Sequence, residues 1–218
     1  MVQKQFGVLV HGAGWVSGEH IKAFQKNPHT KIVDLSSRRK ESILQRAQEA
    51  NLSGIGMYTN LEEALQHEGV DIVSICTPHH VHAQNVVCAA KAGKHLIIAK
   101  PIANSLEEMK AMREAVHQAG VKTVVSFVLR WNPLFSTLKS LSADNAFGKI
   151  YYVETDYQSN IASWWLGFSE ARLKEKGISA MLVAGCHALD TARWLASTDL
   201  NRAAKVTEVF AYNGGWRK

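Results

Sequence analysis

Between residues 6 and 127, short apolar runs alternate with amphipathic stretches. The apolar runs predict strands, and the amphipathic stretches, with apolar residues three and four apart, predict helices. Strands that alternate with helices are typical of a parallel sheet, so this region predicts a doubly wound α/β domain. The predicted strands are Phe6–Val10, Lys31–Ser36, Gly56–Tyr58, Asp71–Cys76, His95–Ile98 and Thr123–Val128, and the predicted helices are Ser17–Lys26, Glu41–Ala50, Leu61–His67, Val81–Ala92 and Ser105–Ala119.

Several residues mark where these helices start and stop. Asn60 and either Asn104 or Ser105 have side chains that can accept the unpaired N–H groups of a first helical turn. Gly93 and Gly120 stand where helices are expected to end, and glycine is the usual residue there.

After Val128 the alternation ends and the composition changes, because five of the six tryptophans follow this point. We therefore expect two domains, residues 1–127 and 128–218. The pattern in the second domain predicts helices Pro133–Asp144 and Leu182–Ala196, strands Lys149–Ser159 and Val206–Tyr212, and an irregular aromatic segment Trp164–Phe168.

The composition, 46% hydrophobic and 20% charged over 218 residues, indicates a globular chain with a proper core. Apolar stretches are too short to span a membrane, and the N-terminal residues do not form a cleavable signal, so we expect a cytoplasmic protein without membrane contact. Cys76, Cys88 and Cys186 are odd in number and lack a Cys-x-x-Cys spacing, which argues against disulfides and a thiolate zinc site.

The net charge of +6 is scattered along the chain without a nucleic-acid-binding motif. We therefore expect no nucleic-acid partner. A mild basic surplus also suits a protein that binds phosphorylated cofactors.

A glycine-rich turn, Gly12-Ala13-Gly14-Trp15-Val16-Ser17-Gly18, joins the first predicted strand to the first predicted helix. In a dinucleotide-binding turn, the first glycine makes the bend and the second lets the pyrophosphate approach the helix N-terminus. Ser17 occupies the position of the third glycine. A tight turn without a ligand is the alternative, but the surrounding strands and helices favour a cofactor site at Gly12, Gly14, Trp15 and Val16.

The end of the second predicted strand usually carries an acid that binds the ribose of NAD. Asp34 lies inside this strand rather than at its end. Ser37 and Arg38 stand at the tip, and a hydroxyl with a guanidinium suits a 2′-phosphate, which modestly favours NADP over NAD. The alternative is that both residues are merely solvated.

The fourth predicted strand ends in Thr77-Pro78-His79-His80-Val81-His82, at the sheet edge where ligands of such folds bind. We expect no metal there, because the adjacent His79 and His80 cannot easily face one ion. Instead, Thr77, Pro78 and His82 are expected to contact the cofactor.

Lys100 directly follows the fifth predicted strand and precedes Pro101. Partial desolvation at the mouth of the crevice would lower the pKa of its ammonium and allow proton exchange with a substrate alcohol. The alternative is a lysine that only reaches out to water.

Together the glycine turn, the Thr-Pro-x-x-x-His loop, Ala92–Pro101 and Gly185–Leu195, in this order, resemble the Gfo/Idh/MocA family of NAD(P)-dependent oxidoreductases. The resemblance implies a Rossmann domain that binds NADP or NAD, followed by an α+β domain with an open, mainly antiparallel sheet. It implies hydride transfer to or from a sugar or polyol, with Lys100 and His187 around the reacting hydroxyl.

The chain departs from this family at two site positions. Ala99 replaces the family's glutamate before the lysine, and Val183 replaces an aspartate that often accompanies the histidine. Family members also usually continue through further strands, which commonly form a homo-oligomer interface, so we expect the second domain to be incomplete.

Further candidates for substrate contacts are Arg130, Trp165 and Asp190. Asp190 could instead form a structural ion pair with Arg193 or another basic residue. The leading function is a sugar or polyol dehydrogenase. The alternatives are an NAD(P)-binding regulatory protein with reduced catalysis and an NAD-dependent glycoside hydrolase.

Overall fold

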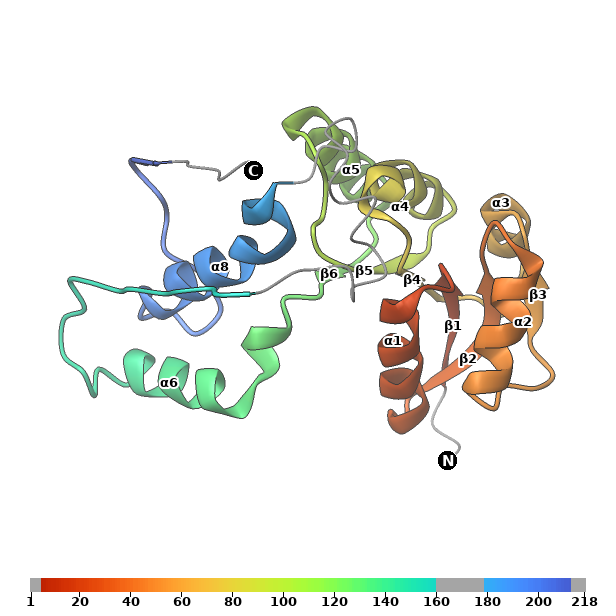
Figure 1. The fold of residues 1–218 in the computed structure, drawn as a ribbon, viewed down its shortest axis with the longest axis horizontal. Helices are drawn as coiled ribbons and strands as arrows, with labels where there is room; N and C mark the ends of the chain where they lie inside the picture. Colours follow the sequence, from red (N-terminus) through yellow and green to blue (C-terminus); the bar gives the residue numbers. More distant parts are fainter. Residues whose placement is uncertain (1–4, 160–178, 213–218) are drawn as a thin grey trace, which may run out of the picture. The chain divides into compact units, whose positions relative to one another are not determined.

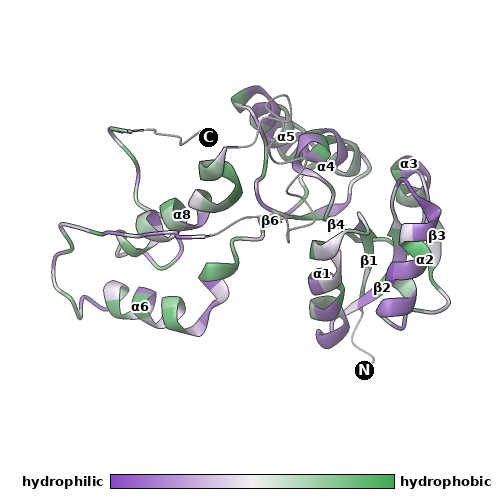
Figure 2. Ribbon diagram, viewed as in Figure 1, coloured by the Kyte–Doolittle hydropathy of each residue, from purple (hydrophilic) through white to green (hydrophobic). Residues whose placement is uncertain are grey.

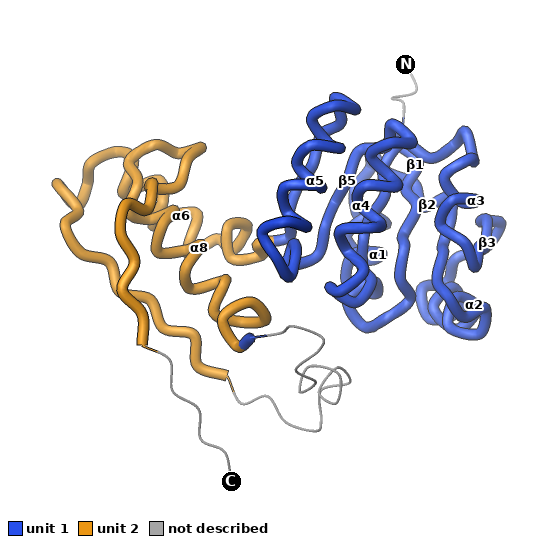
Figure 3. Tube along the Cα trace, turned by 90° about the horizontal axis from the view of Figure 1, so that it is seen from above, with its two compact units in different colours: residues 1–126, 166–179 blue, residues 127–165, 180–218 orange. Residues whose placement is uncertain are grey.

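The structure, a computed structural model, describes residues 5–159 and 179–212 (Figure 1). The chain divides into two compact units (Figure 3). The first contains the described residues up to 126 together with Ser179, and the second contains residues 127–159 and 180–212.

The first unit is a six-stranded parallel sheet in the order β3-β2-β1-β4-β5-β6. This order reverses between β1 and β4, which is the Rossmann arrangement and confirms the predicted doubly wound fold. The strands are β1 (Phe6–His11), β2 (Thr30–Ser36), β3 (Gly56–Tyr58), β4 (Ile72–Ile75), β5 (His95–Ile98) and β6 (Thr123–Val125), and the helices are α1 (Trp15–Lys26), α2 (Lys40–Glu49), α3 (Leu61–Leu65), η1 (His79–Val81, a 3-10 turn), α4 (His82–Lys91) and α5 (Leu106–Ala119).

Apolar side chains cover both faces of this sheet. Successive residues of β1 point to opposite faces, so Leu9 packs in a cluster with residues of α3, α4 and α5, whereas Val8 and Val10 pack with residues of α1 and α2. The helices accordingly carry both hydrophobic and hydrophilic residues (Figure 2). Burial on both faces is the usual condition of a parallel sheet.

The predicted helix caps are confirmed where the structure tests them. The side chain of Asn60 accepts the N–H groups of the first turn of α3, and Ser105 rather than Asn104 caps α5. Gly93 and Gly120 adopt positive φ angles of 74° and 64° just after their helices. Strand β6, however, ends before Val128, because Val128 begins the 3-10 helix η2 (Val128–Trp131).

The second unit contains the two predicted helices. They are α6 (Pro133–Ala143), capped by the side chain of Asn132, and α8 (Cys186–Leu195), which directly follows the π-helix η4 (Met181–Gly185).

The antiparallel sheet of the second unit is not confirmed. No strand is found within residues 127–159 and 180–212, including the expected strands Lys149–Ser159 and Val206–Tyr212. A strand needs a hydrogen-bonded neighbour, and neither segment pairs with another part of the chain that the structure describes. Residues 150–153 and 204–206 line a hollow of about 310 Å³. The aromatic segment Trp164–Phe168 lies outside the described residues.

No helix of the described ranges is long and apolar enough to cross a membrane. In the same ranges, no three His, Cys, Asp or Glu side chains are grouped as a metal site would require.

Candidate functional site

The turn between β1 and α1 has the backbone of a dinucleotide-binding turn. Gly12 has a φ of +106°, and a Cβ atom there would lie 2.6 Å from the backbone of Cys76, so only glycine fits. Gly14 caps α1 and is exposed, and a Cβ atom added to it would meet nothing within 4 Å. A ligand can therefore approach the N–H groups of Trp15 and Val16 in the first helical turn.

The acid of β2 does not reach the cofactor edge of the sheet. The Asp34 side chain is fully buried, with Oδ2 at 2.7 Å from Nδ1 of His67. Gly56 of β3 leaves room for this carboxylate, because a Cβ atom at Gly56 would collide with Oδ1. At the tip of β2, Ser37 is half-buried and Arg38 is exposed.

His82 ties together two loops at the ends of β4 and β5. Its ring is 1% exposed, with Nε2 at 2.8 Å from the carbonyl oxygen of Thr77 and Nδ1 at 2.9 Å from that of Pro101. Burial lowers the pKa of His82. Because both ring nitrogens face backbone carbonyls, His82 holds the loops rather than presenting a nitrogen to a ligand.

A second buried histidine, His11, ends β1. Its Nδ1 lies 2.8 Å from Oγ of Ser36, and Asn85 hydrogen-bonds to its ring. Burial lowers the pKa of His11 to about 4, so its ring is neutral at neutral pH. Asn85 also donates to Oγ1 of Thr77, which connects this histidine to the loop after β4.

Lys100 lies just beyond β5 and is half-buried, in the position that the sequence predicts. The residue before it, Ala99, is 7% exposed, and its N–H donates to the carbonyl oxygen of Ile75 at 3.0 Å. The alanine thus extends the pairing of β5 with β4 and places only a methyl group where the family has a carboxylate.

His187 lies in the first turn of α8, in the second unit, and is 6% exposed. Its ring stacks on Tyr157, with centroids 5.8 Å apart, and meets the ring of Phe127 edge-on at 6.1 Å. Val183 belongs to the π-helix just before α8. Such π-helical turns occur frequently at functional sites.

Arg130 and Asp190 form a bidentate ion pair at 2.7 and 2.8 Å. The hydrogen bond to Asp190 raises the pKa of the Arg130 guanidinium, which also lies over the ring of Trp194. Asp190 thus forms a structural ion pair, as the alternative to a substrate contact, and its partner is Arg130. Arg193 donates instead to the carbonyl oxygen of Ala204. Trp165, the remaining candidate for substrate contact, lies outside the described residues.

The C-terminal end of α8 is held by a buried lysine. Lys139 is 1% exposed, and its ammonium donates to the carbonyl oxygens of Trp194 and Ser197. A cation suits the carbonyl end of a helix, where the backbone carbonyls lack helical partners. Desolvation lowers the pKa of this ammonium.

Three residues with contacts near these sites, Arg46, Asn85 and Lys139, are not predictable from the sequence pattern alone. Arg46 donates to the carbonyl oxygen of Gly14, and Asn85 and Lys139 likewise contact residues far along the chain. In the sequence each has the spacing of an ordinary helix-surface residue. The one available signal was Gly18, a glycine inside a helix, where a neighbouring side chain can need the space of a Cβ atom.

Two family models match this chain. The oxidoreductase family with an NAD-binding Rossmann fold matches residues 6–127, and the GFO/IDH/MocA C-terminal domain matches residues 135–214.

Individual relatives show the same similarity. The D-apiose dehydrogenase of Paraburkholderia graminis is 29% identical over 94% of this chain and 53% of its own length. The levoglucosan dehydrogenase of Pseudarthrobacter phenanthrenivorans is 33% identical over 58% of this chain and 33% of its own length. The chain thus spans about half the length, or less, of the curated relatives it matches.

The fold has a counterpart in a solved structure, the scyllo-inositol dehydrogenase of Lactobacillus casei with bound NAD(H) and scyllo-inositol. The TM-score is 0.77 at 21% identity, over 88% of this chain and 56% of the other. At this identity the likeness concerns the fold alone.

Proposed function

The chain belongs to the Gfo/Idh/MocA oxidoreductase family, and from this premise we propose that it is an NAD(P)-dependent dehydrogenase of a sugar or polyol. The two relatives described above are named as dehydrogenases, one of D-apiose and the other of levoglucosan. Because the chain spans only part of their length, its activity and its substrate class are inferences from the residues it does contain.

The observation that carries the proposal is the turn from Gly12 to Gly14. Its first glycine is required by the positive φ angle and the backbone of Cys76, whereas its second glycine borders open space at the start of α1. Nothing in the packing of the described residues demands glycine at position 14. A bound anion would explain the glycine, because a side chain at position 14 would block access to the N–H groups of the first helical turn.

The described residues fit a nicotinamide dinucleotide. The amides of Gly14, Trp15 and Val16 would hold the pyrophosphate, and Thr77 and Pro78 would border the nicotinamide ribose, with His82 acting indirectly by holding their loop. Bound nicotinamide would supply the hydride donor or acceptor.

For the adenosine ribose, we propose that Ser37 and Arg38 accept a 2′-phosphate and that NADP is favoured over NAD. The burial of Asp34 against His67 supports this preference, because no carboxylate of β2 stands at the tip to repel a phosphate.

We propose that Lys100 and His187 handle the proton of the substrate hydroxyl. Lys100 stands at the carboxyl end of β5, where ligands of open α/β sheets bind. Its ammonium can give this proton, and its neutral amine can accept it. His187 is held between Tyr157 and Phe127 in a fixed ring orientation. The ion pair of Arg130 and Asp190 would support α8, and Asp190 retains 11% exposure for a substrate hydroxyl.

The second candidate is an NAD(P)-binding protein with weak or no turnover. The buried methyl of Ala99 and the side chain of Val183 favour it, because both replace carboxylates that could tune the proton relay. Loss of such a group can lower a rate on the order of 100-fold.

One assay separates the candidates. The chain is incubated with NAD⁺ or NADP⁺ and a panel of sugars and polyols, and the absorbance of reduced nicotinamide is followed. We expect turnover that falls at least ~100-fold in Lys100→Met, with cofactor affinity unchanged, since this is the usual contribution of a general acid or base. His187→Ala should act on the same step, and the double variant should be little worse than the more damaging single variant.

The other outcomes assign the other functions. Dinucleotide binding without reduction across the panel would favour the regulatory protein. Sugar cleavage without net change in the cofactor would favour the glycoside hydrolase. Wild-type turnover in Lys100→Met would remove the lysine from the catalytic assignment.

A further inference from the structure

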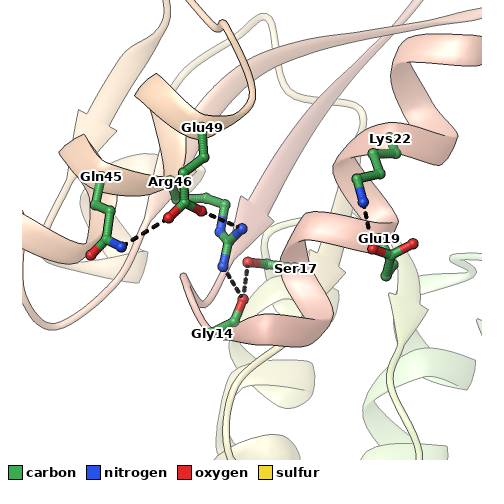
Figure 4. A network of polar contacts seen from close by, with 7 residues as sticks. All are labelled: Gly14, Ser17, Glu19, Lys22, Gln45, Arg46 and Glu49. Atoms are coloured by element: carbon green, nitrogen blue, oxygen red, sulfur yellow. Dashed lines mark hydrogen bonds and ion pairs between the residues drawn. The ribbon is translucent and has the colours of Figure 1, made fainter.

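We propose that Arg46 of α2 is a positioning residue of the dinucleotide site, which sets the direction of the amide at the start of α1 and adds positive charge there. The inference rests on the proposed function, because it concerns the same site. It starts from a contact between residues that are far apart in the sequence: Nη2 of Arg46 donates to the carbonyl oxygen of Gly14 at 2.9 Å (Figure 4).

The Gly14 carbonyl oxygen is held by two donors. Besides Arg46, the hydroxyl of Ser17 donates to it at 2.6 Å. A trans peptide is planar, with its C=O and N–H on opposite sides. Fixing the carbonyl of Gly14 therefore fixes the N–H of Trp15 in the opposite direction, outward from the start of α1. This N–H is one of those expected to bind the pyrophosphate.

The charge of Arg46 stands at the positive end of a helix. The first turn of α1 contains no acidic residue, and the N-terminus of a helix already carries partial positive charge. The partner of Arg46 is Glu49, at 2.7 Å from Nη1, on its own helix (Figure 4). Glu49 offsets part of this charge, but the Nη2 end of the guanidinium faces the turn, which disfavours the empty turn and favours one that holds an anion.

Gly18 makes room for this arrangement. It is buried in α1, and a Cβ atom there would lie 2.8 Å from Nη1 of Arg46. Glycine inside a helix is less favourable than alanine, so its presence needs a reason. Ser17 occupies the position of the third glycine in the family pattern, and the glycine follows it at position 18. The space that Arg46 needs explains why position 18 is a glycine.

The test uses two variants that reach the same interaction from opposite sides. Arg46→Met removes the guanidinium, and Gly18→Ala pushes it away from Gly14 without changing any charge. We expect each to weaken the binding of NAD⁺ and NADP⁺ by roughly 10-fold or more, the scale of a hydrogen bond to a charged group. Because both substitutions remove the same contact between Arg46 and Gly14, the double variant should have about the same affinity as the single variant with the lower affinity.

The matched control is Arg113→Met, which removes an exposed arginine from α5 and changes the net charge equally. Binding is measured by calorimetry at several salt concentrations, and each unliganded variant is melted. Arg46→Met should reduce the salt dependence of binding, whereas Arg113→Met should leave affinity and salt dependence at wild-type values. If Arg46 only joins α2 to α1, Arg46→Met would lower the melting temperature and leave both the affinity and its salt dependence unchanged.

Affinities within twofold of wild type in folded Arg46→Met and Gly18→Ala would overturn the inference. If Arg46→Met does not fold, Gly18→Ala and Arg46→Lys decide by the same criterion, since lysine cannot bind Gly14 and Glu49 as a fork. Failure of the wild-type chain to bind either dinucleotide would refute the proposed function itself, a result distinct from wild-type affinity in the variants.

Discussion

The first and second units differ in what holds the residues of interest. In the first, six paired strands carry the glycine turn, the loop after β4 and Lys100 on their ends. In the second, residues 127–159 and 180–212 contain no strand, and aromatic side chains such as Tyr151 and Tyr212 are 95% and 93% exposed. The position of His187 in this unit depends on contacts of its ring with the side chains of Tyr157 and Phe127. Hydrogen bonds between strands therefore position the residues of interest in the first unit, whereas contacts of individual side chains position His187 in the second unit.

The comparison predicts that one backbone position can disable the first unit. Gly12→Ala would place a Cβ atom 2.6 Å from the backbone of Cys76 at a φ that alanine rarely adopts. We expect a loss of about 4 kcal/mol in the free energy of unfolding, the upper range for single substitutions. Hydrogen exchange should rise in peptides of β1 and β4 first. Gly14→Ala, which meets nothing within 4 Å, is the matched control, and equal loss in both variants would contradict this account.

Acid should also weaken the first unit. The pKa of His11 is lowered to about 4, below its ordinary value of 6.5, so the unfolded chain binds a proton more readily than the folded one. Its stabilising contribution is complete above pH 6.5 and is lost as the pH falls toward 4, by about 3 kcal/mol. Burial lowers the pKa of His20 and His82 as well, which acts in the same direction.

Urea melts between pH 7.5 and pH 4 measure this loss. His11→Asn should show a shallower fall in the free energy of unfolding over that range than the wild type. An identical slope would mean that His11 does not titrate as its burial implies.

The second unit should respond to the loss of one cation. Lys139→Met removes the ammonium donor to the carbonyls of Trp194 and Ser197, which keep longer hydrogen bonds at 3.3 and 3.4 Å. We expect this loss to cost about 2 kcal/mol. The effect should be confined to hydrogen exchange in α6 and α8. Lys149→Met, at an exposed position, is the control, and similar exchange in both variants would remove the assigned role of Lys139.

The smallest expected effect concerns cofactor preference in the first unit. Arg38→Ala should weaken NADP⁺ binding by about 1.5 kcal/mol, roughly 10-fold, and leave NAD⁺ nearly unchanged, because only NADP⁺ carries the 2′-phosphate. Calorimetric titration with both cofactors measures this difference. Equal losses for both would make Arg38 a surface charge without a part in the choice.

The sequence predicted the first unit well because its signals are local. Apolar runs, the caps Asn60 and Ser105, and the stop at Gly120 each depend on neighbouring residues. The strand expected at Lys149–Ser159 depends on a pairing partner, which its own residues cannot specify.

The candidate site follows the same division. The positions of Gly12, Gly14 and Lys100 follow from strand ends that the sequence marks. The contact of Arg46 with Gly14, the two carbonyls at His82, and the ion pair of Arg130 with Asp190 join residues that are distant in the chain. Local patterns do not specify which distant residues meet, so the folded structure is needed to identify these contacts.

The central claim is that the turn at Gly14 binds a nicotinamide dinucleotide, and calorimetric titration of wild type and Gly14→Val with NAD⁺ and NADP⁺ tests it most directly. A Cβ atom at position 14 would meet no protein atom within 4 Å, so we expect the variant to fold and melt like the wild type. We predict that the wild type binds and that Gly14→Val shows no measurable binding. Equal affinity in both proteins would contradict the claim.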